Sequence, residues 1–323
     1  ICWSWDRRTK VREGITMRVA LCLYGLTGSV DFGLGLGKPI DPRIGHYHHN
    51  KRIIKPNENI DVFFHTWSTE FEDMLVDIYK PKKHIAEKQI LFNPDSVGKN
   101  SIPSRWWSNA TVMKLKRSYE EEMGFKYDWV MLYRFDHIFL VDLLFKNLDN
   151  RFMYFRHTNG LRAPAEYSHG YEGREDCTCY DKRGKHGIRL QDVFMFGNSE
   201  NMDAFCSVYK YHQETNQPFL DPHDECYVQL KRVGLENKLK FEYFGYDPHA
   251  PKNIMQCEIM RALFEDPSYD ETKEFDINNF TMITDNLTSN PIVQSRFPGW
   301  TGWDTVDKPE LKERAGFNPS AKI

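Results

Sequence analysis

Short apolar runs alternate with polar turns and with longer amphipathic stretches over the first 235 or so residues. The apolar runs lack helical spacing and bear polar residues at their ends, which predicts buried strands at 19–23, 59–67, 129–132, 152–155 and 190–198, with an edge strand at 81–87. Apolar positions between Ser104 and Met123 recur with the helical period, and Gly124 suits the C-cap of that helix. The alternation of strand and helix predicts an α/β fold with a mainly parallel sheet flanked by helices.

The segments between these elements are expected to be less regular. Ser199 is expected to cap a helix that runs to about His212, and Asp221 and Pro222 begin another. The segment 156–189 is long and polar, which is typical of a flexible acceptor loop. The predicted loops include the glycine-rich Gly33 to Lys38 and a solvated histidine cluster formed by His46, His48 and His49.

The chain divides by composition into three parts. Residues 1–16 are polar and charged and are expected to be an extension or linker, since Met17 leads directly into the first strand. Residues 17–256 are expected to form the main domain. Residues 257–323 lose apolar periodicity and are expected to be an extended tail that packs on the domain or mediates contacts.

Composition narrows the function classes. A net charge of -3 and a pI near 6.5 offer no basic field for nucleic acid, and no apolar run approaches the roughly 18 residues of a membrane span. The seven cysteines form no obvious disulfide framework, which predicts a reducing compartment, the cytoplasm, or the host cytoplasm for a viral protein. Cys177 and Cys179 form a single close pair of cysteines, whereas a zinc site needs four ligands. A zinc site is therefore not expected.

Arg134 and Asp136 are the most informative candidate residues. They follow the buried run 129–132 and stand two apart, so both side chains are expected to point to the same side of an extended chain. The carboxyl ends of strands are where open α/β sheets bind ligands. A buried carboxylate there needs a metal, a sugar hydroxyl or an arginine, and a purely structural Arg134–Asp136 ion pair is the competing interpretation.

Other polar residues are expected on the same rim of the sheet. Tyr24, Gly25 and Thr27 lie in a turn after the first strand, where backbone amides can approach a nucleotide, and Thr66 ends the second strand. Lys114 could reach phosphates from the long helix, as could Lys116, although a solvated helix face also explains both.

The ordered motifs Val19 to Gly25, Asp61 to Trp67, Tyr127 to Asp136 and Asp192 to Ser199 resemble nucleotide-sugar glycosyltransferases of GT-A type, such as those of bacterial polysaccharide loci and of large DNA viruses and phages. The resemblance covers roughly residues 17–235 and implies a Rossmann-like half that binds the nucleotide sugar. It also implies Mn²⁺ or Mg²⁺ at a DxD-type site, which falls on Arg134-Phe135-Asp136 with Asp136 as the metal ligand. Here arginine replaces one acid of the motif.

The resemblance also implies a catalytic carboxylate if the transfer inverts the anomeric centre. Asp192 is the first candidate, with Asp224 and Glu225 as rivals at the start of a helix. Asp224 could instead complete a capping box with Asp221. A retaining enzyme needs no such base.

The expected function is transfer of a hexosyl or pentosyl group from a nucleotide-sugar donor to a glycan or polysaccharide acceptor. A sugar nucleotidyltransferase is one alternative, but Gly25 to Val30 lacks the basic residue expected after its first strand. The other is a non-catalytic carbohydrate-binding or virion structural protein, because 14% of the residues are aromatic and many stand in polar contexts that suit sugar faces.

Overall fold

The computed structural model describes residues 17–28, 40–90, 92, 101–139, 142–157, 190–220, 222–240, 257–259 and 317–318. Several sequence predictions therefore lie outside the described residues. They are the extension 1–16, the loop Gly33 to Lys38, nearly all of the segment 156–189 including Cys177 and Cys179, the cap Asp221 and most of the tail.

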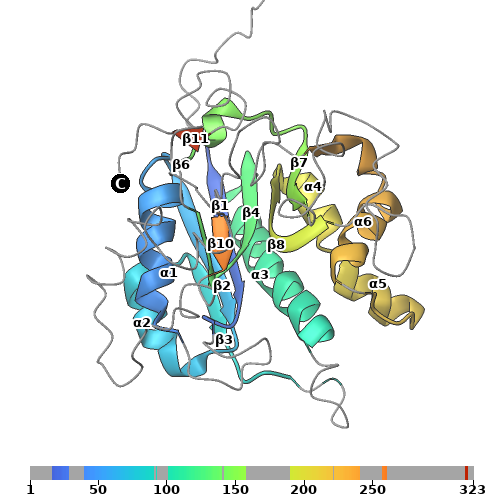
Figure 1. Cartoon of the computed structure of the whole chain (residues 1–323), viewed down its shortest axis with the longest axis horizontal. Coiled ribbons are helices and arrows are strands. Elements are labelled where there is room, and N and C mark those ends of the chain that lie inside the picture. The colour runs from blue at the N-terminus through green and yellow to red at the C-terminus, as the bar shows by residue number, and fades with distance from the viewer. Residues whose placement is uncertain are drawn as a thin grey trace, which may run out of the picture.

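A seven-stranded sheet forms the centre of the domain, in the order β3-β2-β1-β4-β8-β7-β9 (Figure 1). The strands are β1 (Val19–Gly25), β2 (Ile60–Thr66), β3 (Lys83–Ala86), β4 (Trp129–Arg134), β7 (Met153–His157), β8 (Leu190–Gly197) and β9 (Leu239–Lys240). β8 pairs antiparallel with β4 and β7, and the remaining neighbours pair in parallel, so one strand of the seven runs against the others. The predicted α/β class and mainly parallel sheet are confirmed.

Helices cover both faces of this sheet (Figure 1). The main helices are α1 (Pro42–His49), α2 (Glu72–Tyr79), α3 (Ser101–Met123), α4 (Ser199–Phe205), α5 (Val208–Thr215) and α6 (Pro222–Arg232). Single turns of other helix types follow α1 at Asn50–Ile54 and occur at Thr69–Phe71, Phe145–Asn147 and Glu236–Lys238. The long helix predicted before β4 is α3, and Gly124 follows it with φ +69°.

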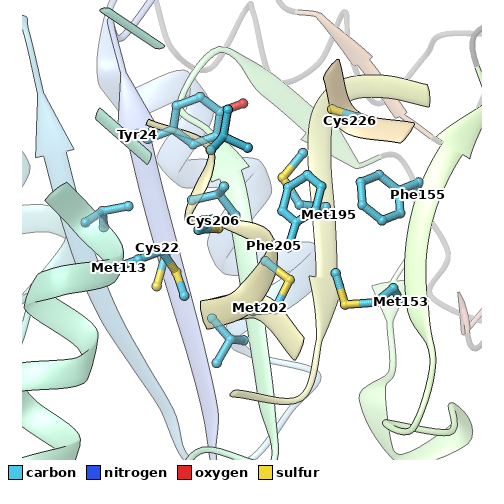
Figure 2. Packing of buried hydrophobic residues seen from close by; sticks show 14 of the residues in the cluster. Cys22, Tyr24, Met113, Met153, Phe155, Met195, Met202, Phe205, Cys206 and Cys226 are labelled. Atoms are coloured by element: carbon cyan, nitrogen blue, oxygen red, sulfur yellow. The ribbon is translucent and has the colours of Figure 1, made fainter. Parts of the chain in front are cut away.

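The period of two in the strands produces two separate cores. In β1, Val19, Leu21 and Leu23 pack into a cluster that includes Leu75 and Tyr79 of α2. The alternate residues Ala20, Cys22 and Tyr24 face the other cluster, with Met113 of α3 and residues of α4 to α6. Figure 2 shows this second cluster, where sulfur-containing and aromatic side chains fill the space between β1, β8 and the helices.

The described free cysteines belong to that second cluster. Cys22, Cys206 and Cys226 are buried (Figure 2). Burial raises the pKa of Cys206 and of Cys226 to about 12, so both remain protonated thiols near neutral pH. These three residues agree with the prediction of inert thiols.

Two local predictions are wrong. The histidine cluster is not a solvated loop, because His46, His48 and His49 lie on α1, and the last two are buried. The helix after β8 is not continuous: it divides at Cys206 into α4 and α5, and its cap is Asn198, whose side chain accepts a hydrogen bond from the Asn201 amide. The exposure of a histidine depends on the element packed against it, which its polarity alone does not reveal.

Two short antiparallel pairs join strands beyond residue 256 to the segment after β4. β5 (His137–Phe139) pairs with β10 (Cys257–Ile259), and β6 (Asp142–Leu143) pairs with β11 (Phe317–Asn318). Among the helices in the described ranges, none combines the length and the apolar character that a membrane crossing requires.

Candidate functional site

The topology of the sheet indicates where a ligand would bind. From β1 the chain passes to β2 and β3 on one side, and then crosses through α3 to β4 on the other side of β1. In open α/β sheets, ligands bind outside the carboxyl ends of the strands at such a switch point. Gly25 ends β1 and Arg134 ends β4, and the two strands are paired up to the register Tyr24–Arg134. The turn after Gly25 and the residues after Arg134 therefore lie on the two sides of the crevice that this topology predicts at the switch point.

The turn after β1 is held by a network of hydrogen bonds. Gly25 has φ +91°, and its amide donates to Ser108 Oγ at 3.0 Å. Its carbonyl accepts from the Thr66 hydroxyl at 3.0 Å, while the amide and hydroxyl of Thr27 both donate to Ser68 Oγ. Thr27 and Thr66 are fully buried. Their side chains support the turn, so direct contact of these hydroxyls with a nucleotide, as the sequence suggested, does not follow from the geometry.

Gly28 brings this turn into contact with the residues after β4. It has φ +114°, and a Cβ placed on it would lie 2.8 Å from Cβ of Asp136 and 3.1 Å from Cδ1 of Ile40. No real Cβ makes such an approach without a shift of its neighbours, so only glycine fits here. From the sequence, Gly28 was not a candidate site residue, although it lies in the turn after the first strand. The two glycines, Gly25 and Gly28, are the sequence feature that indicates a tight turn here.

Arg134 and Asp136 form a bidentate ion pair. Arg134 Nε donates to Asp136 Oδ1 at 2.7 Å, and Nη2 donates to Oδ2 at 2.6 Å. The prediction that both side chains point to one side is confirmed. The Arg134 side chain is 26% exposed and that of Asp136 is 7% exposed, so the arginine is partly open to solvent while the carboxylate is nearly buried. Burial alone would lower the pKa of Arg134, but the charge of Asp136 outweighs it and the pKa is raised.

This pair does not fit a divalent cation. Mn²⁺ and Mg²⁺ bind carboxylate oxygens, and both oxygens of Asp136 already accept hydrogen bonds from Arg134. Within the described ranges, no three histidine, cysteine, aspartate or glutamate side chains gather into a set that could hold a metal. The arginine that replaces the first acid of the motif therefore supplies a positive charge directly beside Asp136.

A second charged group lies beside this pair. Arg105 of α3 places Nη1 2.6 Å from Oδ2 of Asp192, and its Nη2 donates to the Asp192 carbonyl at 2.7 Å. The Tyr24 hydroxyl donates to the same carbonyl at 2.8 Å, and burial raises the pKa of Tyr24 to about 12. Arg105 was not among the residues predicted from the sequence. Its spacing of three from Ser108, which bonds Gly25, is a sign that both face the end of β1.

Asp192 lies close to both arginines and to a histidine. Burial pushes the pKa of its carboxyl up, but the charges of Arg105, His223 and Arg134 outweigh burial and lower the pKa. Nδ1 of His223, at the start of α6, lies 3.5 Å from Asp192 Oδ1 and 2.9 Å from the carbonyl oxygen of Leu190. The structure thus brings Asp192 to the same edge of the sheet as Tyr24 and Arg134. His223, which precedes the predicted Asp224, was missed.

The other two candidate bases differ from Asp192. The carboxylate of Glu225 is buried, where it lies 3.1 Å from His212 Nε2 and 3.2 Å from Arg232 Nη1 and accepts the amide of Leu220. It therefore holds α5 and α6 together, which argues against its predicted role as a base. Asp224 is partly buried in the first turn of α6, beside His223.

The lysines of α3 lie on different faces of the helix. Lys116 is buried and contacts Glu120, Asp203 and Ser199 at 3.0, 2.9 and 2.7 Å, so it does not reach for phosphate as the sequence suggested. Lys114 is exposed. It stands six residues beyond Ser108, which corresponds to about 9 Å along the helix axis, away from the carboxyl ends of β1 and β2.

The sequence matches no known protein-family model and gives no significant match among curated proteins. The functional interpretation of the crevice therefore depends on its own geometry and on the motifs in the chain.

Proposed function

We propose that the protein is a glycosyltransferase of GT-A type, which transfers a hexosyl or pentosyl group from a nucleotide-sugar donor to a glycan acceptor. One observation carries this proposal. The turn that contains Gly25 and Gly28, the Arg134–Asp136 pair and the Arg105–Asp192 pair meet outside the carboxyl ends of β1 and β4. A crevice at the switch point with a tight glycine turn and two guanidinium groups suits a nucleoside diphosphate.

Each part of the crevice has a separate task in this proposal. The turn after β1 lets the nucleotide approach the backbone, because Gly25 has no neighbour within 4 Å of the position that a Cβ would take. Arg134 faces the diphosphate and stabilises the charge that develops as the nucleotide leaves. It contacts Asp136 through Nε and Nη2, so that pairing leaves Nη1 outside the interaction. Asp136 then holds the guanidinium in place.

The order of elements also supports a GT-A assignment. The first half of the sheet, from β1 to β4, supplies the turn and Arg134, while β8 and α6 supply Asp192 and His223 from the opposite side. A donor bound by the first half would therefore face side chains from the second half. The proposed reaction uses neither Mn²⁺ nor Mg²⁺, because both carboxylate oxygens of Asp136 accept hydrogen bonds from Arg134.

A specific observation favours a second candidate, a carbohydrate-binding protein on the same scaffold. The bidentate Arg134–Asp136 pair satisfies both carboxylate oxygens without any ligand, as a purely structural ion pair would. The two candidates differ in their response to nucleotides, since a lectin has no use for a diphosphate site.

A thermal-shift series separates these functions. The ligands are UDP, GDP, CMP and dTDP, each with and without Mn²⁺, and a ligand at 100 times its Kd stabilises the folded state by about 2.7 kcal/mol. We expect one nucleotide to raise Tm without metal. A rise that requires Mn²⁺ would contradict the role of Arg134, and no rise with any nucleotide would favour the carbohydrate-binding protein.

Two variants then locate the site. Asp136→Ala should abolish release of nucleotide from the sugar donor while unfolding stays cooperative, and Arg134→Ala should weaken nucleotide binding. The matched control is Arg151→Ala, since Arg151 makes the same two-residue pairing with Asp149 in an exposed turn before β7. Wild-type turnover in Asp136→Ala would remove Asp136 from the site.

A further inference from the structure

His223 lies beside Asp192, and the prediction that Asp192 is the catalytic base gives His223 no role. His223 Nδ1 lies 2.9 Å from the Leu190 carbonyl and 3.5 Å from Asp192 Oδ1. Both acceptors are oxygens, so in the neutral ring the proton lies on Nδ1 and the lone pair lies on Nε2. The His223 side chain is 34% exposed, and that of Asp192 is 14% exposed.

Asp192 is poorly suited to take a proton itself. Its Oδ2 lies 2.6 Å from Arg105 Nη1, and a carboxylate beside a buried guanidinium is stabilised as the anion. Burial raises the pKa of Asp192, but Arg105, His223 and Arg134 together lower it below the ordinary aspartate value. A general base works best when its pKa lies near the operating pH. An anion held in this way is better suited to orient a neighbouring imidazole.

We propose that His223 is the general base that deprotonates the acceptor hydroxyl, and that Asp192, fixed by Arg105, is the residue that positions its ring. This inference rests on the proposed glycosyltransferase function. It makes the transfer a single displacement with inversion at the anomeric carbon.

The step balances without any further reactant. The O–H bond of the acceptor breaks and its proton moves to Nε2 of His223. The acceptor oxygen forms a bond to the anomeric carbon as the bond from that carbon to the diphosphate breaks, and the electron pair leaves on the diphosphate near Arg134. The imidazolium that forms faces the Asp192 carboxylate, which stabilises it.

Charged groups from several elements surround this pair. Asp192 comes from β8, Arg105 from α3 and Arg134 from β4, while Asp224, Glu225 and the Cys226 thiol follow His223 on α6. Arg105 and Arg134 both favour the ionised form of Asp192. A proton already on Nε2 would prevent His223 from taking the proton of the acceptor, so the pH profile of the activity tests this role.

The first test uses His223→Asn in the full chain. The amide nitrogen of asparagine can keep the hydrogen bond to the Leu190 carbonyl, while the basic Nε2 is lost, so the fold is expected to survive. The measured rate is release of nucleotide from UDP-glucose, UDP-galactose, GDP-mannose or dTDP-glucose, with water as the acceptor. We expect a loss of about 100-fold or more in kcat, as for other general bases, with nucleotide Kd unchanged.

A pH profile and a rescue experiment separate catalysis from a structural role. The acid limb of the wild-type profile should disappear in His223→Asn, and imidazole added to His223→Ala should restore part of the rate. Asp192→Asn should lower kcat far more than it raises KM. The control is His84→Asn, because His84 is 32% exposed and pairs with Glu72 at 3.2 Å on the edge strand β3.

The outcomes distinguish this inference from the proposed function. Methanol as the acceptor yields a methyl glycoside whose anomeric configuration NMR reports, and inversion supports the inference. If the wild type transfers the sugar with retention, or His223→Asn keeps the wild-type rate and pH profile, the inference fails and the glycosyltransferase function stands. If the wild type binds none of the nucleotides, both fail together.

Discussion

Gly28 and Asp136 lie in direct contact although 108 residues separate them: a Cβ on Gly28 would lie 2.8 Å from Cβ of Asp136. This contact joins the turn after β1 to the ion pair after β4, which are the two sides of the proposed nucleotide site. The close approach of these two segments therefore depends on a residue with no side chain.

Gly28→Ala is expected to disturb the crevice and the fold together. The new methyl group must displace Asp136 or Ile40, and φ of +114° is strained for any residue with a Cβ. The free energy of unfolding should fall by about 2–4 kcal/mol, and nucleotide affinity should fall roughly tenfold. Urea denaturation and titration with the stabilising nucleotide measure the two effects.

Gly234→Ala is the matched control for that substitution. Gly234 also has a positive φ, +69°, but a Cβ there would have no neighbour within 4 Å. It should lose about 1–2 kcal/mol of stability from backbone strain and keep wild-type nucleotide affinity. Equal affinities for the Gly28 and Gly234 variants would show that the contact with Asp136 does not shape the site.

Arg134 and Asp136 are expected to be strongly coupled in stability. Arg134→Ala leaves a nearly buried carboxylate without its partner, which costs about 3 kcal/mol. The double variant with Asp136→Ala removes that charge and should recover part of the loss. A double-mutant cycle by urea denaturation measures the coupling. Additive losses would mean that the two side chains do not pair in solution.

We expect Lys116 to contribute to the stability of the fold and Lys114 to contribute little. Lys116→Met leaves the buried carboxylate of Glu120 without one of its cations and should cost about 3 kcal/mol. Lys114→Ala, two residues earlier on an exposed face, should change stability by less than about 0.5 kcal/mol. It should also leave nucleotide affinity unchanged. A clear loss of affinity would instead restore Lys114 to the nucleotide site.

The stability of the fold is expected to decrease as pH falls from about 6.5 to about 4. Burial lowers the pKa of His49 from 6.5 to about 4, and its neutral ring lies between the Tyr79 hydroxyl and the His137 carbonyl, each at 2.7 Å. Because the unfolded chain binds the proton more readily, stability is complete above pH 6.5 and is lost as pH falls toward 4. The loss from His49 amounts to about 3 kcal/mol at most.

Comparison with His49→Gln isolates this contribution. Urea denaturation at pH 7 and pH 4.5 gives the pH dependence of each protein, and the variant should lose roughly 2 kcal/mol less than the wild type across that interval. The same loss in both proteins would assign the acid sensitivity to other groups. His48 is one of these, because burial lowers its pKa as well.

The local part of the site could be predicted from the sequence. Residues 129–134 formed the expected strand because an unbroken apolar run can bury both faces of a sheet, and Arg134 and Asp136 shared a side because of the period of two. The partners of Glu225 could not be predicted, since the start of a helix marks where a carboxylate lies and not which side chains surround it. His212 and Arg232 approach Glu225 only when α5 packs beside α6.

The sequence by itself determined β1 to β4, β7 and β8, the long helix α3 and the order in which they follow one another, because these depend on periodicity and on turn residues within short windows. The tertiary structure alone decided which side chains share the crevice. Arg105 meets Asp192 across 87 residues, and His223 meets it through the packing of α6 against β8. Such contacts arise from the crossing of elements in three dimensions, and no spacing along the chain encodes them.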